Sequence, residues 1–235
     1  MSKTLVLAVA LVTIIAGGLL KYAGSKSPAM TPIATTASAQ ETTAAPATTA
    51  PETTVSSQAS KVPDMILGKT DAPVTVVEYA SFTCPHCANF HATVWDQFKK
   101  NYIDTGKVKF VYREVYFDKF GLWGAMVARC GGPEKYFGIA DMLYDGQRDW
   151  LASGEPTGIS DALRKIGLKA GLAADAVNAC LDDKDMAQAM ITNYQTNATA
   201  DKVEGTPTFI INGESHGGEM SYEEFAALVD AKLPK

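Results

Sequence analysis

Two cysteines three positions apart, Cys84 and Cys87, enclose Pro85 and His86 within the run SFTCPHCANFH. Such a Cys-x-x-Cys pair can bind a metal ion, form a structural disulfide or exchange electrons with other thiols, and its spacing alone does not separate these uses. A disulfide across three positions closes a very small loop and is therefore a weak structural restraint. A zinc or copper site would need more ligands, for which His86 and His91 are the nearest candidates.

Dithiol chemistry fits these residues best. The attacking sulfur must be a thiolate, whereas an unperturbed cysteine is mostly protonated near neutral pH. Cys84 immediately precedes a predicted helix, whose unpaired N–H groups and positive dipole end stabilise an anion. His86 adds a donor in the same turn, where Pro85 is tolerated because its missing N–H is not needed. Cys87, one turn deeper, is predicted to be the resolving thiol, and a stabilised thiolate at Cys84 makes the disulfide oxidising.

The sequence around the pair predicts a β-α-β unit. Residues 74–80 (VTVVEYA) are mostly β-branched and apolar, which is typical of a strand buried on both faces. Apolar residues then recur at helical spacing after Cys84, and residues 108–117 (VKFVYREVYF) return to strand character. A right-handed crossover would make the two strands parallel, with the cysteine pair in the first turn of the intervening helix.

The remainder predicts a helical block followed by a hairpin and a last helix. An Asn212-Gly213 turn follows the strand-like run TPTFII and indicates a β-hairpin, and Ser221 begins a capping box before an amphipathic helix. Residues 117–200 are mostly helical in pattern. The predicted segments there are Leu122–Cys130, Lys135–Tyr144, Ser160–Ile166, Ala173–Leu181 and Asp185–Ala200.

The runs EYASFTCPHC and GTPTFIING, with a helical insertion between them, resemble the DsbA-like thiol–disulfide oxidoreductases of the bacterial periplasm. The resemblance covers residues 62–235. It implies an α/β, thioredoxin-like fold of the thioredoxin superfamily with a helical insertion at about residues 117–200. It also implies that Thr206-Pro207 is a cis-proline loop beside the cysteine pair, where Thr206 binds an extended substrate segment.

The acid within the first strand, Glu78, matches the buried acidic residue of these families. In that role it would exchange a proton with the second sulfur, helped by the desolvation of a buried carboxyl. The alternative is an acid at a strand edge or end that reaches solvent. His91 stands where DsbA-like proteins can carry an acid, so it is either a departure that alters redox tuning or a residue on the helix face.

Cys130 and Cys180 are each placed near the end of a predicted helix, and we expect them to form a structural disulfide across the insertion. An even cysteine count in an exported chain permits such bonds. Two buried free thiols, or a shuttle pair that relays electrons from Cys84–Cys87, are the alternatives.

The N-terminal region has a different composition. Residues 4–20 are uncharged and apolar and would span roughly 25 Å as a helix, slightly less than the hydrocarbon core of a bilayer. We therefore expect residues 1–23 to be a signal peptide or a membrane anchor. Residues 24–61 are rich in Ser, Thr, Ala and Pro and predict a disordered linker, which leaves residues 62–235 as the folded domain.

The resemblance implies an enzyme that introduces disulfides into exported proteins by thiol–disulfide exchange at Cys84–Cys87. Its clients would be exported proteins with free thiols, and a quinone-linked membrane protein of the DsbB type would reoxidise it. We expect a periplasmic monomer, with residues 4–20 available as a tether to the inner membrane. The cysteine pair would serve in place of a cofactor, and we expect no metal. The net charge of −5 without a basic block argues against nucleic acid.

Two other functions remain open at this stage. A disulfide isomerase or reductase would use the same cysteines in their reduced form, although isomerases of this family usually carry a dimerisation module that the linker cannot supply. A copper or zinc metallochaperone would use the cysteines as ligands and would show little thiol oxidation.

Overall fold

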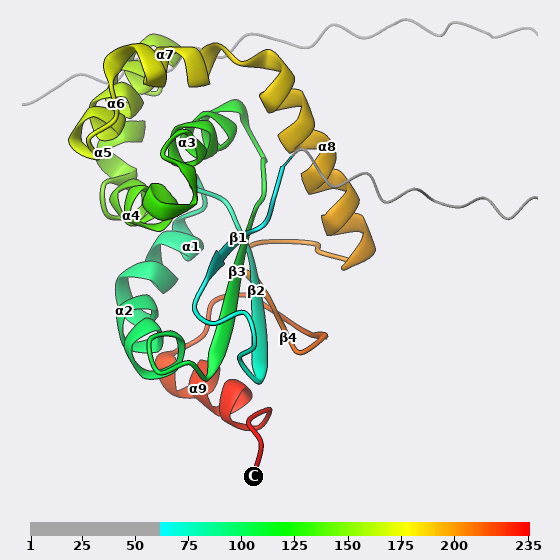
Figure 1. The fold of residues 1–235 in the computed structure, drawn as a ribbon. Helices are drawn as coiled ribbons and strands as arrows, with labels where there is room; N and C mark the ends of the chain where they lie inside the picture. Colours follow the sequence, from blue (N-terminus) through cyan, green and yellow to red (C-terminus); the bar gives the residue numbers. More distant parts are fainter. Residues whose placement is uncertain (1–61) are drawn as a thin grey trace, which may run out of the picture. The chain divides into compact units, whose positions relative to one another are not determined.

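The computed structural model describes residues 62–235 (Figure 1). The segments predicted at residues 1–23 and 24–61 lie outside the described residues. Within residues 62–235, no helix is long and apolar enough to cross a membrane.

A five-stranded sheet of order β1-β3-β2-β4-β5 forms the centre of this part. Its central strands β2 and β3 are parallel, as the crossover rule predicts, and the other neighbouring pairs are antiparallel. Asn212 and Gly213 both have positive φ angles between β4 and β5, which fits the predicted hairpin turn. The strands are β1 (Met65–Leu67), β2 (Val74–Ala80), β3 (Val108–Glu114), β4 (Thr208–Ile211) and β5 (Glu214–Gly217).

Helices cover both faces of the sheet, with α1 and α2 on one side and α8 on the other (Figure 1). The helix that begins after Cys84 continues past α1 through two π-helical turns, His91–Trp95 and Lys99–Ile103, on either side of α2. The helices are α1 (Pro85–Phe90), α2 (Asp96–Phe98), α3 (Lys119–Cys130), α4 (Gly132–Asp145), α5 (Gln147–Leu151), α6 (Pro156–Lys169), α7 (Ala174–Asp182), α8 (Lys184–Ala200) and α9 (Tyr222–Asp230).

Four phenylalanines join the helices α1, α2 and α9 to the strand β4. The rings of Phe90, Phe209 and Phe225 lie 4.6 to 5.2 Å apart between centroids, and Phe98 contacts Phe225 at 4.8 Å. All four are fully buried, and burying one such side chain contributes about 1.5–3 kcal/mol. This aromatic cluster fixes α1 and α9 on the same face of the sheet.

The predicted helices all exist, and the β-α-β unit, the helical insertion, the hairpin and the last helix follow one another in the expected α/β order. The sequence interpretation missed β1 and α5. Each is short, with three and five residues respectively, too few for a periodic pattern to stand out. The capping box at Ser221 is present, with Glu224 bonding back to the Ser221 backbone.

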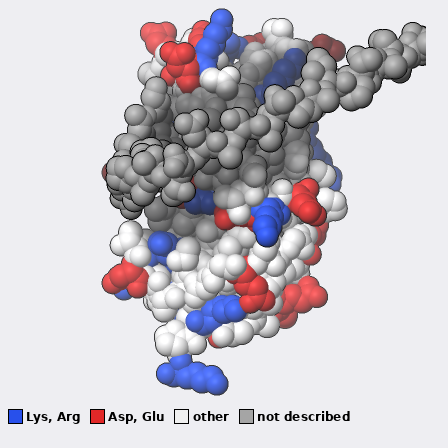
Figure 2. All heavy atoms as spheres, turned by 90° about the vertical axis from the view of Figure 1, so that its right-hand side faces the viewer, with Lys and Arg blue, Asp and Glu red and all other residues white. Residues whose placement is uncertain are grey.

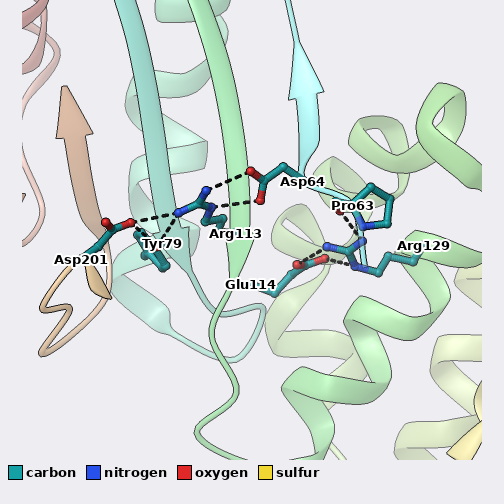
Figure 3. Close-up of polar contacts among 7 residues, drawn as sticks. All are labelled: Pro63, Asp64, Tyr79, Arg113, Glu114, Arg129 and Asp201. Atoms are coloured by element: carbon teal, nitrogen blue, oxygen red, sulfur yellow. Dashed lines mark hydrogen bonds and ion pairs between the residues drawn. The ribbon is translucent and has the colours of Figure 1, made fainter. Parts of the chain in front are cut away.

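Two arginines join the beginning of the described part to the sheet (Figure 3). Arg113 of β3 makes a bidentate pair with Asp64, at 3.0 Å for each bond, and also donates to Asp201 and to the hydroxyl of Tyr79. This network links strands β2 and β3 to the residue that follows α8.

Arg129 of α3 is buried against Glu114 at the end of β3, in a second bidentate pair with distances of 2.7 and 2.6 Å. It also donates to the carbonyl of Pro63 (Figure 3). The hydroxyl of Tyr136 donates to Glu114 as well. Both charged groups of this cluster are bonded on several sides, so removing either partner would leave the other as an unpaired buried charge. The cluster attaches the insertion to the sheet.

Figure 2 shows one side of the molecule, on which acidic and basic side chains are interspersed where the described residues are visible.

The predicted Cys130–Cys180 disulfide is present and joins the end of α3 to α7, with the Cα atoms 5.9 Å apart. It closes a loop with a sequence separation of 50 residues within the helical insertion.

Replacing both Cys130 and Cys180 with alanine should destabilise the fold by about 4 kcal/mol, because the unfolded chain regains the entropy of an open loop. Urea denaturation of the two proteins with the Cys84–Cys87 pair in the same redox state measures this difference. Thiol oxidation by Cys84 should persist in the folded variant. Lost oxidation with unchanged stability would instead indicate the shuttle role.

Candidate active site

Cys84 occupies the N-cap of α1, directly beyond the loop that follows β2. Pro85 fills the first helical position, and the N–H of Ala88 donates to the carbonyl of Cys84 at 3.1 Å. The local sequence thus ends an apolar strand and begins a helix at Cys84 itself.

Contacts from the insertion hold this loop in place. The buried amide of Gln147 donates to the carbonyls of Phe82 and Cys84 at 2.9 and 3.0 Å, and Thr83 donates to Asp118 at 2.7 Å. The sequence interpretation did not identify Gln147 as a functional residue. Its role depends on a contact 63 residues along the chain, and no local signal reports such a contact.

The two sulfurs of the pair are free thiols in different surroundings. Hydrogen bonds from the Cys87 thiol, from Thr206 and from the backbone N–H groups of Cys87 and His86 outweigh burial and lower the pKa of Cys84 to about 5. Burial, followed by the effects of Cys84 and Glu78, raises the pKa of Cys87 far above its ordinary value. Cys84 is 8% exposed and Cys87 is fully buried, so only the sulfur with the lowered pKa reaches the surface.

The lowered pKa of Cys84 makes the stability of the reduced protein depend on pH. The unfolded thiol keeps its proton up to about pH 8.5, whereas the folded one loses it near pH 5. Between these values the free energy of unfolding should rise by at most about 1.4 kcal/mol per pH unit relative to Cys84→Ser. This contribution is lost as the pH falls through 5. Urea denaturation of both proteins from pH 4 to 8 tests this, and a difference independent of pH would contradict it.

The Thr206-Pro207 peptide bond is cis, as the family resemblance implied. The carbonyl oxygen of Thr206 lies 3.5 Å from the Sγ atom of Cys84, so the loop before β4 faces the reactive sulfur. The structure therefore brings together Cys84, Cys87 and this loop, which the sequence separates by about 120 residues.

Glu78 is fully buried in β2, which rules out the alternative of an acid that reaches solvent. His91 is also buried, and its Nε2 atom lies 3.3 and 3.2 Å from the two carboxyl oxygens of Glu78. His91 is thus the partner of the buried acid, a pairing that the sequence interpretation did not foresee.

An acid from the loop before α9 contacts the active-site helix. One oxygen of Glu219 lies 2.9 Å from Nδ1 of His86, and the other accepts from the amide of Asn89. The hydrogen bond to Glu219, then the charge of Cys84, raises the pKa of His86, and His86 and Asn89 together lower the pKa of Glu219. Sequence reasoning missed Glu219, which lies 133 residues from His86 in the chain.

Replacing Glu219 with Gln should lower the pKa of His86 towards 6.5, because the carboxylate that favours the imidazolium is gone. NMR titration of the His86 ring measures the shift. Glu214→Gln is the matched control, since Glu214 is an exposed acid that pairs with Lys232 instead.

The same substitution should slightly lower the pKa of Cys84. His86 is protonated near pH 5 with or without Glu219, so the variant removes only a negative charge from the neighbourhood of the thiolate. A raised pKa of Cys84 in Glu219→Gln would contradict this account.

The remaining cysteines and the third histidine lie in other elements than this site. Cys130 and Cys180 form the disulfide of the insertion, and His216 lies on β5 beside Glu214. Among residues 62–235, no group of three or more His, Cys, Asp or Glu side chains is arranged to hold a metal ion.

Comparison with known proteins places this arrangement in a family. A family model described as thioredoxin matches residues 60–231, so the chain belongs to the thioredoxin family. The crystal structure of alpha-DsbA1 from Wolbachia pipientis is similar over 72% of this chain and 89% of that one, with 30% identity and a TM-score of 0.65. The solved relative is therefore a DsbA protein, in agreement with the resemblance drawn from the sequence.

Curated relatives agree with this assignment. Disulfide bond formation protein D of Bacillus subtilis is 27% identical over 183 residues, which cover 76% of this chain and 81% of that protein. Proteins of Rickettsia bellii and Rickettsia felis, whose names include protein-disulfide oxidoreductase, are 36% and 35% identical over 64% and 72% of this chain. The chain spans only 57% and 60% of the length of these two relatives.

Proposed function

We propose that this chain is a thiol–disulfide oxidoreductase of the DsbA type that introduces disulfides into exported proteins. The observation that carries the proposal is the difference between the two sulfurs. The lowered pKa of Cys84 makes its sulfur a good leaving group and the site of attack by a client thiolate. The raised pKa of Cys87 keeps that residue a protonated thiol in the reduced protein.

The reaction begins when a client thiolate attacks Cys84 in the Cys84–Cys87 disulfide, which gives a mixed disulfide and releases Cys87. A second client thiolate then attacks the client sulfur of that mixed disulfide. Cys84 departs as a stabilised thiolate, and the client leaves oxidised. The lowered pKa of Cys84 favours this last step, because a more acidic thiol leaves faster.

The loop at Thr206-Pro207 supports a docking mode for the client. Its carbonyl faces Cys84, so an extended client segment that pairs with the backbone there would present its sulfur to the reactive cysteine. Glu78, buried below the pair, would exchange the proton of Cys87.

The partners and location follow from the same proposal. The clients are exported proteins with free thiols, and a quinone-linked membrane protein of the DsbB type reoxidises the pair. The enzyme works as a periplasmic monomer, tethered by residues 4–20 where that segment is retained. The cysteine pair is its redox group, without a further cofactor or metal.

Cys84→Ser should abolish oxidation of a reduced client. In Cys87→Ser, mixed with a client that already holds a disulfide, the Cys84 thiolate should attack that bond and release one client thiolate, so that a mixed disulfide accumulates because no second thiol of the pair resolves it. Mass spectrometry after acid quenching distinguishes the two variants. Equilibration with glutathione gives the redox potential of the pair. We expect a value closer to that of a strong oxidant, about −120 mV, than to that of a thioredoxin, about −270 mV.

Other outcomes favour the other functions. A potential near that of thioredoxin would contradict the oxidase and support the reductase. An ordinary pKa of about 8.5 for Cys84, with zinc or copper retained by the reduced protein and no client oxidation, would support the metallochaperone. The double alanine variant of Cys130 and Cys180 serves as the control that keeps the active pair.

A further inference from the structure

Glu78 and His91 form a buried polar cluster one helical turn from Cys87. Glu78 from β2 is fully buried, the side chain of His91 is 5% exposed, and Nε2 of His91 lies 3.2 Å from the nearer carboxyl oxygen. The N–H of His91 bonds to the carbonyl of Cys87, so the two residues occupy successive turns of the same helix. Burial and the hydrogen bond to Cys84 are the larger causes that raise the pKa of Cys87, and the charge of Glu78 adds to them.

The two ring nitrogens of His91 have different surroundings. Nε2 faces Glu78, whereas Nδ1 is buried and has no hydrogen-bond partner. A buried N–H without an acceptor is unfavourable, so the hydrogen is better placed on Nε2. In that tautomer His91 donates its hydrogen bond to Glu78, and such a bond favours the carboxylate form of a buried carboxyl.

Two aromatic rings pack against the imidazole of His91 and leave its hydrogen bond to Glu78 in place. Tyr144 of α4 stacks on the ring at 4.1 Å, and Tyr112 of β3 approaches it edge-on. Both tyrosines have pKa values raised chiefly by burial, so they remain neutral there. Asp141 of α4 is the other charged group that interacts with His91, and burial raises its pKa.

We infer that His91 is a positioning residue for the redox reaction, one that holds Glu78 as the carboxylate able to accept the proton of Cys87. The inference rests on the proposed function, in which Cys87 must lose its proton whenever the disulfide forms again. His91 itself does not touch the reacting sulfurs in this scheme and acts through Glu78.

The proton and electron balance closes within the site. When a client thiolate attacks Cys84, the disulfide bond breaks, its electron pair passes to the Cys87 sulfur, and that sulfur takes a proton from the Glu78 carboxyl. On reoxidation, the Cys87 thiol returns the proton to the Glu78 carboxylate and its sulfur bonds to Cys84. The thiolate displaced from Cys84 carries away the electron pair of the broken mixed disulfide.

The oxidation of the reduced protein by oxidised glutathione separates the two steps. Cys84 first attacks glutathione disulfide and becomes a mixed disulfide, and Cys87 then displaces the glutathione. Acid quenching and mass spectrometry follow both species, and Cys87→Ser supplies the rate of the first step alone. His91→Phe keeps a ring for Tyr144 but has no donor, whereas His91→Gln carries an amide donor near the position of Nε2.

The first step should be unchanged in both variants. The second step should slow about tenfold or more in His91→Phe, because Glu78 loses the bond that keeps it a base, and should stay within about threefold of the wild type in His91→Gln. His216→Gln, on β5, is the control and should match the wild type in both steps. Melting temperatures verify that each variant is folded.

A second step at the wild-type rate in His91→Phe and a slow one in His91→Gln would mean that the His91 ring only fills space. That result would overturn the inference. If His91→Phe does not fold, His91→Asn takes its place, since its amide falls near Nδ1 and cannot reach Glu78. The same slow second step is then expected, and a normal one overturns the inference. A wild-type protein in which the first step itself fails would contradict the proposed function, whereas a normal first step with an unaffected second step contradicts only the role of His91.

Discussion

The site depends on one constraint, which is that two sulfurs a single helical turn apart must differ in acidity. Cys84 lies at the helix start, where backbone N–H groups and the Cys87 thiol stabilise its anion. Cys87 lies inside the core, where burial disfavours a thiolate. No local sequence could create both environments alone, because the first needs an exposed helix end and the second needs a packed sheet below it. The position of α1 on the sheet therefore determines the chemistry.

Two neighbouring strands of the sheet, β2 and β4, create these environments. β2 delivers Glu78 into the core and then ends just before Cys84, so the acid and the cysteine pair are fixed by one short segment. β4 lies next to β2 and brings the loop at Pro207 to the same edge. The aromatic contacts of Phe90 with Phe209 and Phe225 hold the helix over these strands. Redox tuning and core packing thus use the same contacts.

The parts of the site that could be predicted are those with a recognisable pattern within a few consecutive residues. The pair Cys84 and Cys87, the helix start at Pro85 and the hairpin at Gly213 each have a local signature, and the family resemblance supplied Pro207. Glu219 and Gln147 could not be found in this way. Both reach the active-site helix or loop from distant loops and helices, through side chains whose types are common on any protein surface. The pairing of His91 with Glu78 was hidden for a different reason, since it depends on the depth at which the helix lies on the sheet.

The helical insertion is part of the redox site as well as an addition to the fold. Its helix α4 supplies Tyr144, which closes the cluster behind Cys87, and α5 begins with Gln147, which binds the carbonyl of Cys84. These contacts keep the loop before α1 in place with no direct role in electron transfer. The buried pair of Arg129 with Glu114 attaches the insertion to the sheet at a third point. The Cys130–Cys180 disulfide joins α3 to α7 within the same insertion, so it stabilises the helical block from which these contacts come.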